Sequence, residues 1–271
     1  MQRISRQFFA IVFVLVFSAP AFPHEYWLEP ETFFPAVGEK INIRMYLGEG
    51  LKKEEERPYQ AEKTVFLNQF FARISSPAKN NQNGSMPFYS YTHGGQAGNH
   101  MFALERNWSY VTLEPAKFED YLREDGIEYI IAERAKRGEA NKAGRERYGR
   151  FLKTLIQVGN KRDDTYKMKS GLRLDITPLE NPYSKKVGDN LIFQINFDGK
   201  ALAGRTVFAD NRDGETISKV KMVTDANGRI TVKLDRKGVW LVRLVMMQRC
   251  ESDCSESDWE SFWGSLSFGV R

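Results

Sequence analysis

Two segments of the chain alternate apolar and polar side chains and resemble each other. Residues 37–48 and 187–198 each begin with Val-Gly and an acidic residue, a combination that indicates a turn. Prolines lie a few residues upstream of both segments. Strict alternation after such a turn predicts a half-buried β-strand. The apolar positions are Ile41, Ile43 and Met45 in the first segment and Leu191, Phe193, Ile195 and Phe197 in the second. We interpret the pair as an internal repeat, and the alternative is a chance match between common turns.

The C-terminal half continues with short apolar runs separated by turn residues. Runs at 203–209, 220–223, 230–234, 239–245 and 263–270 follow one another, and Asn227-Gly228 favours a tight hairpin. Short strands with regular turn signals are typical of β-sandwich folds.

The middle of the chain is rich in helix formers instead. Pro115 suits the first turn of a helix, and apolar spacing predicts helices that begin there, at 127–137 and at 144–158. We interpret the basic residues here as a solvated face, with a docking surface for a membrane or an acidic partner as the alternative. These residues are Arg134, Lys136, Arg137, Lys142, Arg145, Arg147, Arg150 and Lys153.

The patterns together predict a mainly β protein with two Ig-like or transthyretin-like β-sandwich domains and a helical connector. The expected N-terminal sandwich spans 22–114, the connector or insertion 115–170, and the C-terminal Ig-like sandwich 171–271.

Residues 1–21 have the pattern of a secretory signal peptide. Arg3 and Arg6 precede an apolar run at 8–17, and Ala19-Pro20-Ala21 is a small-x-small cleavage signal. The apolar run is too short for a comfortable transmembrane helix. We therefore expect a periplasmic protein that is soluble after cleavage and has no transmembrane segment.

Export decides how the two cysteines are interpreted. Cys250 and Cys254 are the only ones, and an oxidising compartment favours a disulfide between them. A metal site with two thiolates is the alternative, although no further zinc ligands lie nearby in the sequence.

Composition is that of a globular protein, with 41% hydrophobic and 13% aromatic residues. The formal net charge of +5 comes from 40 basic and 35 acidic residues that are interleaved along the chain. A nucleic-acid partner needs a concentrated basic face, so we expect none.

Imidazole chemistry can involve only three residues, His24, His93 and His100. A glycine-rich stretch between the last two would let them converge, and Glu25 could add an oxygen ligand if the N-terminal segment folds toward them. Cleavage after residue 21 would put His24 third, but Pro23 has no amide proton to lose, which blocks the usual N-terminal copper or nickel chelate. The alternative interpretation is a polar loop with surface histidines.

Motifs of the common catalytic classes are absent from the sequence. There is no Gly-x-Ser-x-Gly, no His-Glu-x-x-His and no phosphate-binding glycine loop. We therefore predict that the protein is not an enzyme and assign no catalytic residues.

Four sequence segments resemble a family of exported bacterial proteins described as nickel/cobalt-uptake-associated, the DUF4198 group. They are residues 24–30 (HEYWLEP), 146–155 (ERYGRFLKTL), 224–229 (TDANGR) followed by 238–241 (GVWL), and 258–263 (DWESFW). The resemblance implies a periplasmic Ig-like protein that handles divalent metal. One departure is that family members often carry a histidine just after the Gly-x-Trp-Leu strand, and this chain has none there.

Two functional hypotheses follow. The first is a metal-binding accessory that uses His24, His93, His100 and Glu25 to pass nickel or cobalt, less favourably copper or zinc, to a transporter in the inner or outer membrane. The second is a non-catalytic Ig-like module that binds a protein or cell-envelope polymer through exposed aromatics. Candidates for that patch are Trp259, Phe262, Trp263, Tyr89 and Tyr91. The alternative, which we favour for each of them taken singly, is packing in the core or at a strand edge.

Overall fold

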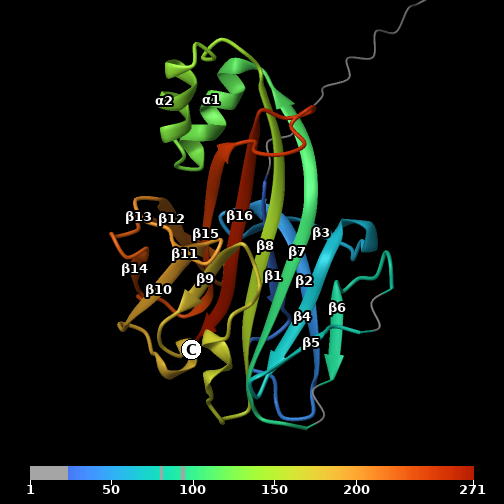
Figure 1. Ribbon diagram of the computed structural model, residues 1–271. Helices are drawn as coiled ribbons and strands as arrows, with labels where there is room; N and C mark the ends of the chain where they lie inside the picture. Colours follow the sequence, from blue (N-terminus) through green and yellow to red (C-terminus); the bar gives the residue numbers. More distant parts are fainter. Residues whose placement is uncertain (1–23, 80–81, 93–94) are drawn as a thin grey trace, which may run out of the picture.

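A long central β-sheet organises the fold in the computed structural model, which describes residues 24–79, 82–92 and 95–271 (Figure 1). The sheet has eight strands in the order β13-β12-β15-β16-β8-β7-β4-β5. In this order their bounds are Thr216–Val223, Thr206–Asp213, Gly238–Arg249, Trp259–Val270, Gly144–Val158, Gly98–Leu113, Thr64–Phe71 and Ile74–Pro77. Neighbours are antiparallel except β16 and β8, which are parallel. The chain is therefore mainly β, as the sequence predicts.

Two four-stranded sheets accompany the central one. One contains β1 (Glu25–Pro30), β2 (Lys40–Glu49), β3 (Lys52–Arg57) and β6 (Tyr89–Thr92). The other contains β9 (Leu174–Pro178), β10 (Asn190–Phe197), β11 (Lys200–Ala201) and β14 (Arg229–Lys233). The two repeat segments form β2 and β10, and each pairs with all three other strands of its sheet. The alternate apolar residues that were predicted to face inward are buried in both strands. They are Ile41, Ile43 and Met45 in β2 and Leu191, Phe193 and Ile195 in β10.

The two small sheets cover opposite faces of the central sheet. Along β8, Leu152 and Ile156 pack with the β1–β2 sheet, whereas Phe151 and Leu155 pack with the β9–β10 sheet. Because successive side chains of a strand point to opposite faces, this alternation defines three layers with a core on each side of the middle layer.

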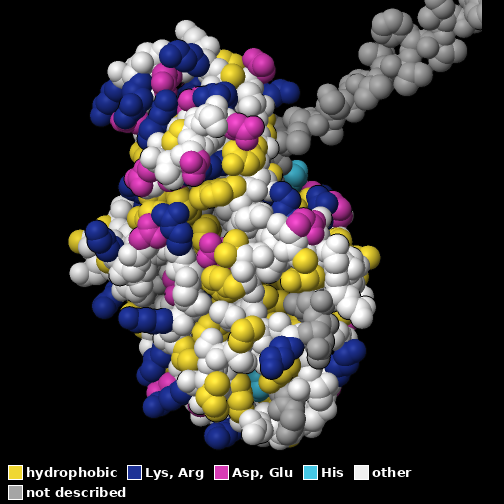
Figure 2. Space-filling view, turned by 45° about the vertical axis from the view of Figure 1, so that its right-hand side comes forward, with side chains coloured by type: hydrophobic (Ala, Val, Ile, Leu, Met, Phe, Trp, Pro, Cys, Tyr) yellow, Lys and Arg dark blue, Asp and Glu magenta, His cyan; other side chains and the backbone are white. Residues whose placement is uncertain are grey.

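Two helices lie at one end of the long strands (Figure 1). They are α1 (Pro115–Glu124) and α2 (Tyr129–Lys136), both between β7 and β8, so the first two predicted helices are confirmed. Their apolar faces pack on Trp259 and Trp263 of β16, which belong to the face that also carries the β1–β2 sheet. Lys and Arg side chains are interspersed with Asp and Glu around this end in Figure 2.

The predicted helix at 144–158 is wrong, because this segment is strand β8. The basic residues of this segment are not the solvated face that we expected: Arg147, Arg150 and Lys153 are buried. Arg147 pairs with Glu260 at 2.5 Å, and Lys153 pairs with Asp175. A strand that is buried on both faces has no apolar alternation to detect, so distant partners decide its structure. Arg134 on α2 is also buried, unlike the expectation.

Short helical turns complete the chain at Ala61–Lys63, Asp164–Lys167 and Pro182–Ser184. Among the described residues, no helix has the length and apolar character needed to cross a membrane. The parallel contact between β8 and β16 joins a strand from the segment predicted as the connector, 115–170, to a strand from the segment predicted as the C-terminal sandwich, 171–271.

Candidate functional site

The predicted metal ligands occupy different parts of the fold. His24 immediately precedes β1, with Nδ1 3.4 Å from Glu54 Oε2, and its side chain is 37% exposed. Glu25 is the first residue of β1 and is buried. His100 lies on β7, fully inside, with its ring stacked on Phe71 at 4.3 Å between centroids. His93 lies outside the described residues.

The structure does not bring His24 and His100 together. Arg150 of β8 donates a hydrogen bond from Nη1 to the carbonyl of His24 (3.1 Å), whereas His100 is paired with Ile156. Six residues separate these two positions along β8, which corresponds to about 20 Å of strand. Across 24–79, 82–92 and 95–271, no three His, Cys, Asp or Glu side chains are arranged to hold a metal ion. A single site that uses both histidines is therefore not formed.

His24 and Glu25 instead line a pocket between the β1–β2 sheet and the end of α1. Its volume is about 260 Å³. Four carboxylates and one imidazole line it together with one lysine, a tyrosine and a glycine. The lining residues are His24, Glu25, Gly48, Glu49, Tyr121, Glu124, Asp125 and Lys219. We call this space the acidic pocket. Glu49 and Glu124 are exposed at its rim, whereas the side chains of Glu25 and Asp125, 10% and 13% exposed, lie deeper.

Beneath the acidic pocket, one guanidinium is shared by three acids. Arg243 of β15 contacts Glu25 Oε1 through Nη1 and Asp210 Oδ2 through Nε, both at 2.5 Å. Asp125 Oδ1 is more distant, at 4.0 Å from Nη1. Asp210 of β12 is completely buried. Three carboxylates around one cation leave a deficit of positive charge inside the fold.

Burial beside these charges makes two acids of the pocket, Glu25 and Asp125, weaker than usual. Burial raises the pKa of Glu25 to about 7, with Arg243 opposing the change and Asp210 adding to it. Burial likewise raises the pKa of Asp125 to about 8, against the attraction of Arg243. Desolvation favours the uncharged acid, and a neighbouring carboxylate acts in the same direction. At neutral pH these two carboxyl groups are therefore partly protonated, and a cation that binds them displaces their protons into solvent.

A further buried carboxyl, that of Glu146, adjoins the pocket through Tyr121. The Tyr121 hydroxyl donates to Glu146 Oε1 at 3.0 Å, and Ser261 donates to the same oxygen. In the part of the chain that the structure describes, Glu146 Oε2 is buried without a hydrogen-bond partner. Burial raises the pKa of Glu146 to about 7, although the hydrogen bonds from Ser261 and Tyr121 oppose the rise.

Arg150 fixes the strand that carries the first pocket residues. Its guanidinium lies over the ring of Tyr26 at 3.7 Å and also near Tyr148 and Trp263. Because it also donates to the His24 carbonyl, it anchors the backbone at the pocket wall. Ser265 and Ser267 donate to further carbonyls of β1, at Tyr26 and Leu28.

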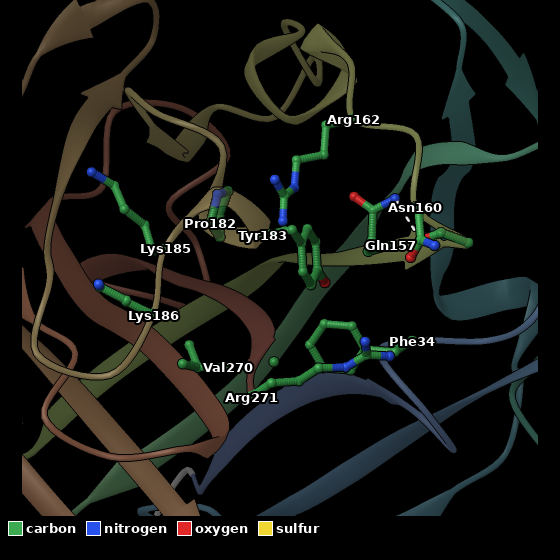
Figure 3. Close-up of a pocket in the computed structure, with 12 residues that line it drawn as sticks. Phe34, Gln157, Asn160, Arg162, Pro182, Tyr183, Lys185, Lys186, Val270 and Arg271 are labelled. Carbon is green, nitrogen blue, oxygen red and sulfur yellow. Dashed lines mark hydrogen bonds between the residues drawn. The ribbon is translucent and has the colours of Figure 1, made fainter.

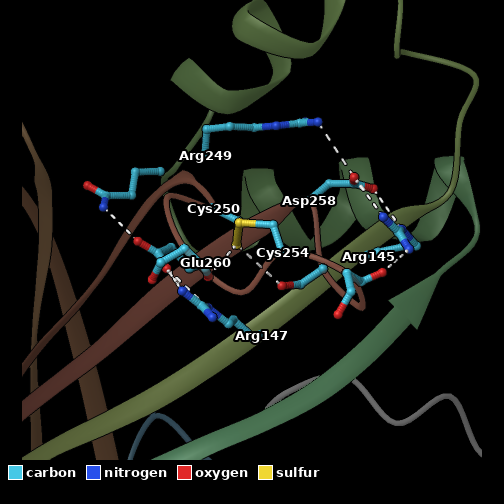
Figure 4. The surroundings of a disulfide bond; sticks show 11 residues. Arg145, Arg147, Arg249, Cys250, Cys254, Asp258 and Glu260 are labelled. Atoms are coloured by element: carbon cyan, nitrogen blue, oxygen red, sulfur yellow. Dashed lines mark hydrogen bonds and ion pairs between the residues drawn. A yellow bond between two sulfur atoms is a disulfide. The ribbon is translucent and has the colours of Figure 1, made fainter.

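The two cysteines form a disulfide, as predicted. Cys250 and Cys254 are bonded in the loop between β15 and β16, and both sulfurs are therefore used (Figure 4). This excludes the alternative of a two-thiolate metal site in the structure as it stands. Next to the loop, the guanidinium of Arg145 makes two hydrogen bonds of 2.9 Å to Asp258, which ties the loop to the start of β8.

The aromatic patch proposed for an interaction module is not exposed. Trp259, Phe262, Trp263 and Tyr89 are buried, and Tyr91 is partly buried against Phe102. These aromatics contribute to the core between layers, so the structure agrees with the alternative interpretation, core or strand-edge packing, and not with a surface patch.

Sequence reasoning found His24 and Glu25 but missed the rest of the acidic pocket. Glu49, Glu124 and Asp125 come from β2, from α1 and from the residue after α1. Nothing in their local sequence marks them, because their proximity depends on how the helices dock beside β1. Glu124 and Asp125 follow Tyr121 by three and four positions, which is the ordinary spacing of neighbours on any helix and does not distinguish a site.

Comparison with known proteins gives one family match. A model described as a domain of unknown function (DUF4198) matches residues 21–248. No curated protein matches the chain. Among solved structures, the three N-terminal domains of the bacteriophage RB49 Highly Immunogenic Outer Capsid protein (Hoc) align over 90% of this chain with 9% identity and a TM-score of 0.19. The chain spans 59% of that structure's chain, and a TM-score this low carries no argument about fold or function.

Proposed function

The chain belongs to the DUF4198 family, and from that premise we propose that it is an exported, periplasmic, non-enzymatic accessory that binds a divalent metal ion in the acidic pocket. The observation that carries the proposal is the lining of the pocket, in which four carboxylates and one imidazole surround about 260 Å³. Nickel or cobalt is the proposed cargo, with copper or zinc less favoured, and a transporter in the inner or outer membrane is the proposed recipient.

The electrostatics of the pocket favour a cation. Glu25, Asp125 and Asp210 share one guanidinium, that of Arg243, so a divalent ion can supply the positive charge that protons on Glu25 and Asp125 otherwise supply near neutral pH. Metal binding requires deprotonated ligands and therefore releases protons from acids that hold them at neutral pH. A mixed set of imidazole and carboxylate donors suits a borderline ion better than a soft one.

The exposed rim carboxylates provide the ligand movement that such a site needs. The described residues do not form a ready metal cluster, and Glu49 and Glu124 are the side chains with freedom to turn inward. The proposed ligand set differs from the predicted one, because His100 takes no part. His100 on β7 pairs with Ile156, which lies about 20 Å along β8 from Arg150, the residue that contacts His24.

Export is proposed from two features of the chain. The leader pattern of residues 1–21 lies outside the described residues. The disulfide between Cys250 and Cys254 is the kind of bond that persists in an oxidising compartment. The packing of antiparallel sheets on both faces of the central sheet supports the finer proposal of Ig-like or transthyretin-like sandwiches.

Isothermal titration of the chain from residue 22 with Ni(II), Co(II), Cu(II) and Zn(II) tests the metal proposal. We expect one ion per chain with a dissociation constant in the micromolar range or tighter, and heats at pH 7 that vary with the buffer because protons are released. Glu49→Gln/Glu124→Gln should weaken binding at least tenfold, and His24→Ala should do the same.

A matched control removes two exposed carboxylates away from the pocket, Glu215→Gln/Glu251→Gln. It changes net charge equally and should leave affinity unchanged. The proposal fails if no ion binds, if the pocket variants bind as the parent does, or if the control weakens binding equally.

The second candidate is the non-catalytic module that binds a protein or envelope polymer. Strand β13 is an edge of the central sheet, and it exposes Ile217, Val220 and Val223 at 42, 51 and 62%. An exposed edge with apolar side chains suits the addition of a partner strand. This candidate predicts that Val220→Lys abolishes partner binding and leaves the metal titration unchanged.

A further inference from the structure

A second pocket lies at the opposite ends of strands β8 and β16 from the helices. Its volume is about 390 Å³, within the range of small-molecule sites. Because β8 and β16 are parallel, both strands end beside it. Its walls come from the end of β8 and the loop that follows, the turn at Pro182–Ser184 with the two lysines after it, the end of β16, and the loop after β1.

Every charged residue that lines this pocket is basic. They are Arg162, Lys185, Lys186 and Arg271, and no Asp or Glu lines it. Figure 3 shows Arg162 reaching from one side toward Tyr183, with both lysines on the neighbouring loop. This charge distribution is the reverse of that in the acidic pocket. We call this space the basic pocket.

Two of the four cations remain available to a ligand. Lys185 pairs with Glu180 at 2.7 Å, and the guanidinium of Arg271 lies over the ring of Phe34 at 4.0 Å. Within the described ranges, Arg162 and Lys186 have no acidic partner within 4 Å. In Figure 3 Arg162 points toward Tyr183, whereas Lys186 lies on the loop across the pocket with its amine directed outward. Arg162 is therefore the cation placed to contact an anion, and Lys186 adds to the positive charge of the rim.

The inner part of the basic pocket is apolar and fixed. Tyr183 and Val270 are buried there, and the Tyr183 hydroxyl donates to the carbonyl of Leu155. The side-chain amide of Gln157 donates from Nε2 to the carbonyls of Gly159 and Lys161. These hydrogen bonds fix the loop after β8, which forms one wall of the pocket. With its backbone and its aromatic ring both held, this inner part is preorganised for contact with an apolar group.

We propose that the basic pocket binds a small organic anion, whose carboxylate meets Arg162, with Lys186 adding to the attraction at the rim, and whose apolar body packs against Tyr183 and Val270. A bare inorganic anion would use only the basic rim, and a neutral apolar molecule only the inner part. The ligand class is therefore defined by both ends together. The site is separate from the acidic pocket and does not depend on metal binding.

Titration with 3-phenylpropionate, followed by calorimetry or by ¹H–¹⁵N chemical shifts, tests this proposal. We expect saturable binding of one molecule per chain. The neutral isostere 3-phenylpropionamide should bind at least tenfold more weakly, and so should inorganic phosphate. The double variant Arg162→Gln/Lys186→Gln should also lose at least tenfold in affinity for 3-phenylpropionate.

The control Lys117→Gln/Lys136→Gln removes two exposed charges on the helices, at the far end of the fold, and should bind as the parent does. The proposal is overturned if 3-phenylpropionate does not bind or if the amide binds equally. It is also overturned if phosphate binds as tightly, or if both double variants behave alike. Because metal-free protein is used throughout, these outcomes are independent of those for the acidic pocket.

Discussion

Glu146→Gln should remove a pH-dependent loss of stability. The Glu146 side chain is fully buried, its Oε1 accepts hydrogen bonds from Tyr121 and Ser261, and burial raises its pKa to about 7 from 4.5. Glutamine keeps the shape and the accepting oxygen and stays uncharged. The variant therefore imitates the protonated side chain at every pH.

The direction follows from proton linkage. The folded state holds the Glu146 proton to higher pH than the unfolded state, so its contribution to stability is full below pH 4.5 and is lost as pH rises through about 7. Between pH 5.5 and the folded pKa lie about one and a half pH units, each worth ~1.4 kcal/mol. We therefore expect the parent to lose about 2 kcal/mol relative to the variant between pH 5.5 and 8.5.

Denaturation by urea, followed by tryptophan fluorescence at intervals across this pH range, measures the effect. The difference between parent and variant at each pH cancels most of the contribution of Glu25 and Asp125, which titrate in both proteins. Tyr121→Phe removes a hydrogen bond that lowers the Glu146 pKa, so it should move the transition to higher pH. Parallel curves for parent and Glu146→Gln would refute the reasoning.

Three further changes test the packing and cross-links. Cys250→Ser/Cys254→Ser opens a loop of sequence separation 4, so the loop-entropy relation gives a loss of about 2 kcal/mol, measurable by denaturation and matched by a reductant acting on the parent. Lys153→Met leaves Asp175 without its cation and should cost roughly 3 kcal/mol, most of which Lys153→Met/Asp175→Leu should recover in the same assay. Gly144→Ala would force a methyl group against the ring of Phe118 in α1. We expect this clash to lower the free energy of unfolding by about 1–3 kcal/mol and the melting temperature by several degrees.

Local patterns were sufficient where a strand has one buried face. Ile41, Ile43 and Met45 alternate with polar residues, and β2 forms where that alternation predicts it. The helix after Pro115 was equally visible, because its buried residues and its starting proline lie within ten positions. In these segments the information that determines the structure is contained in the segment itself.

Strand β8 and the acidic pocket show why the remainder was not predictable. Arg147 finds Glu260 at a sequence separation of 113, and Arg243 finds Glu25 more than two hundred positions away. Each of these charges is unfavourable in a core until its partner arrives. The sequence near a buried charge does not identify a partner that is so distant. A buried strand with three basic residues therefore resembles an amphipathic helix when it is considered alone.

The parallel pairing of β16 with β8 has a consequence for how the sheet is completed. Strand β16 contributes residues 259–270 to the middle of the central sheet, between β8 and β15. Before β16 is in place, strands β4, β5, β7 and β8 have no hydrogen-bonded connection within that sheet to strands β12, β13 and β15. The central sheet is complete only when β16, near the end of the chain, pairs with the sequence-distant β8. Contacts of high sequence separation form slowly, so we expect slow folding. A fragment cut to the family-matched span, 21–248, would lack this strand and present two long unpaired edges, the kind of surface on which chains aggregate.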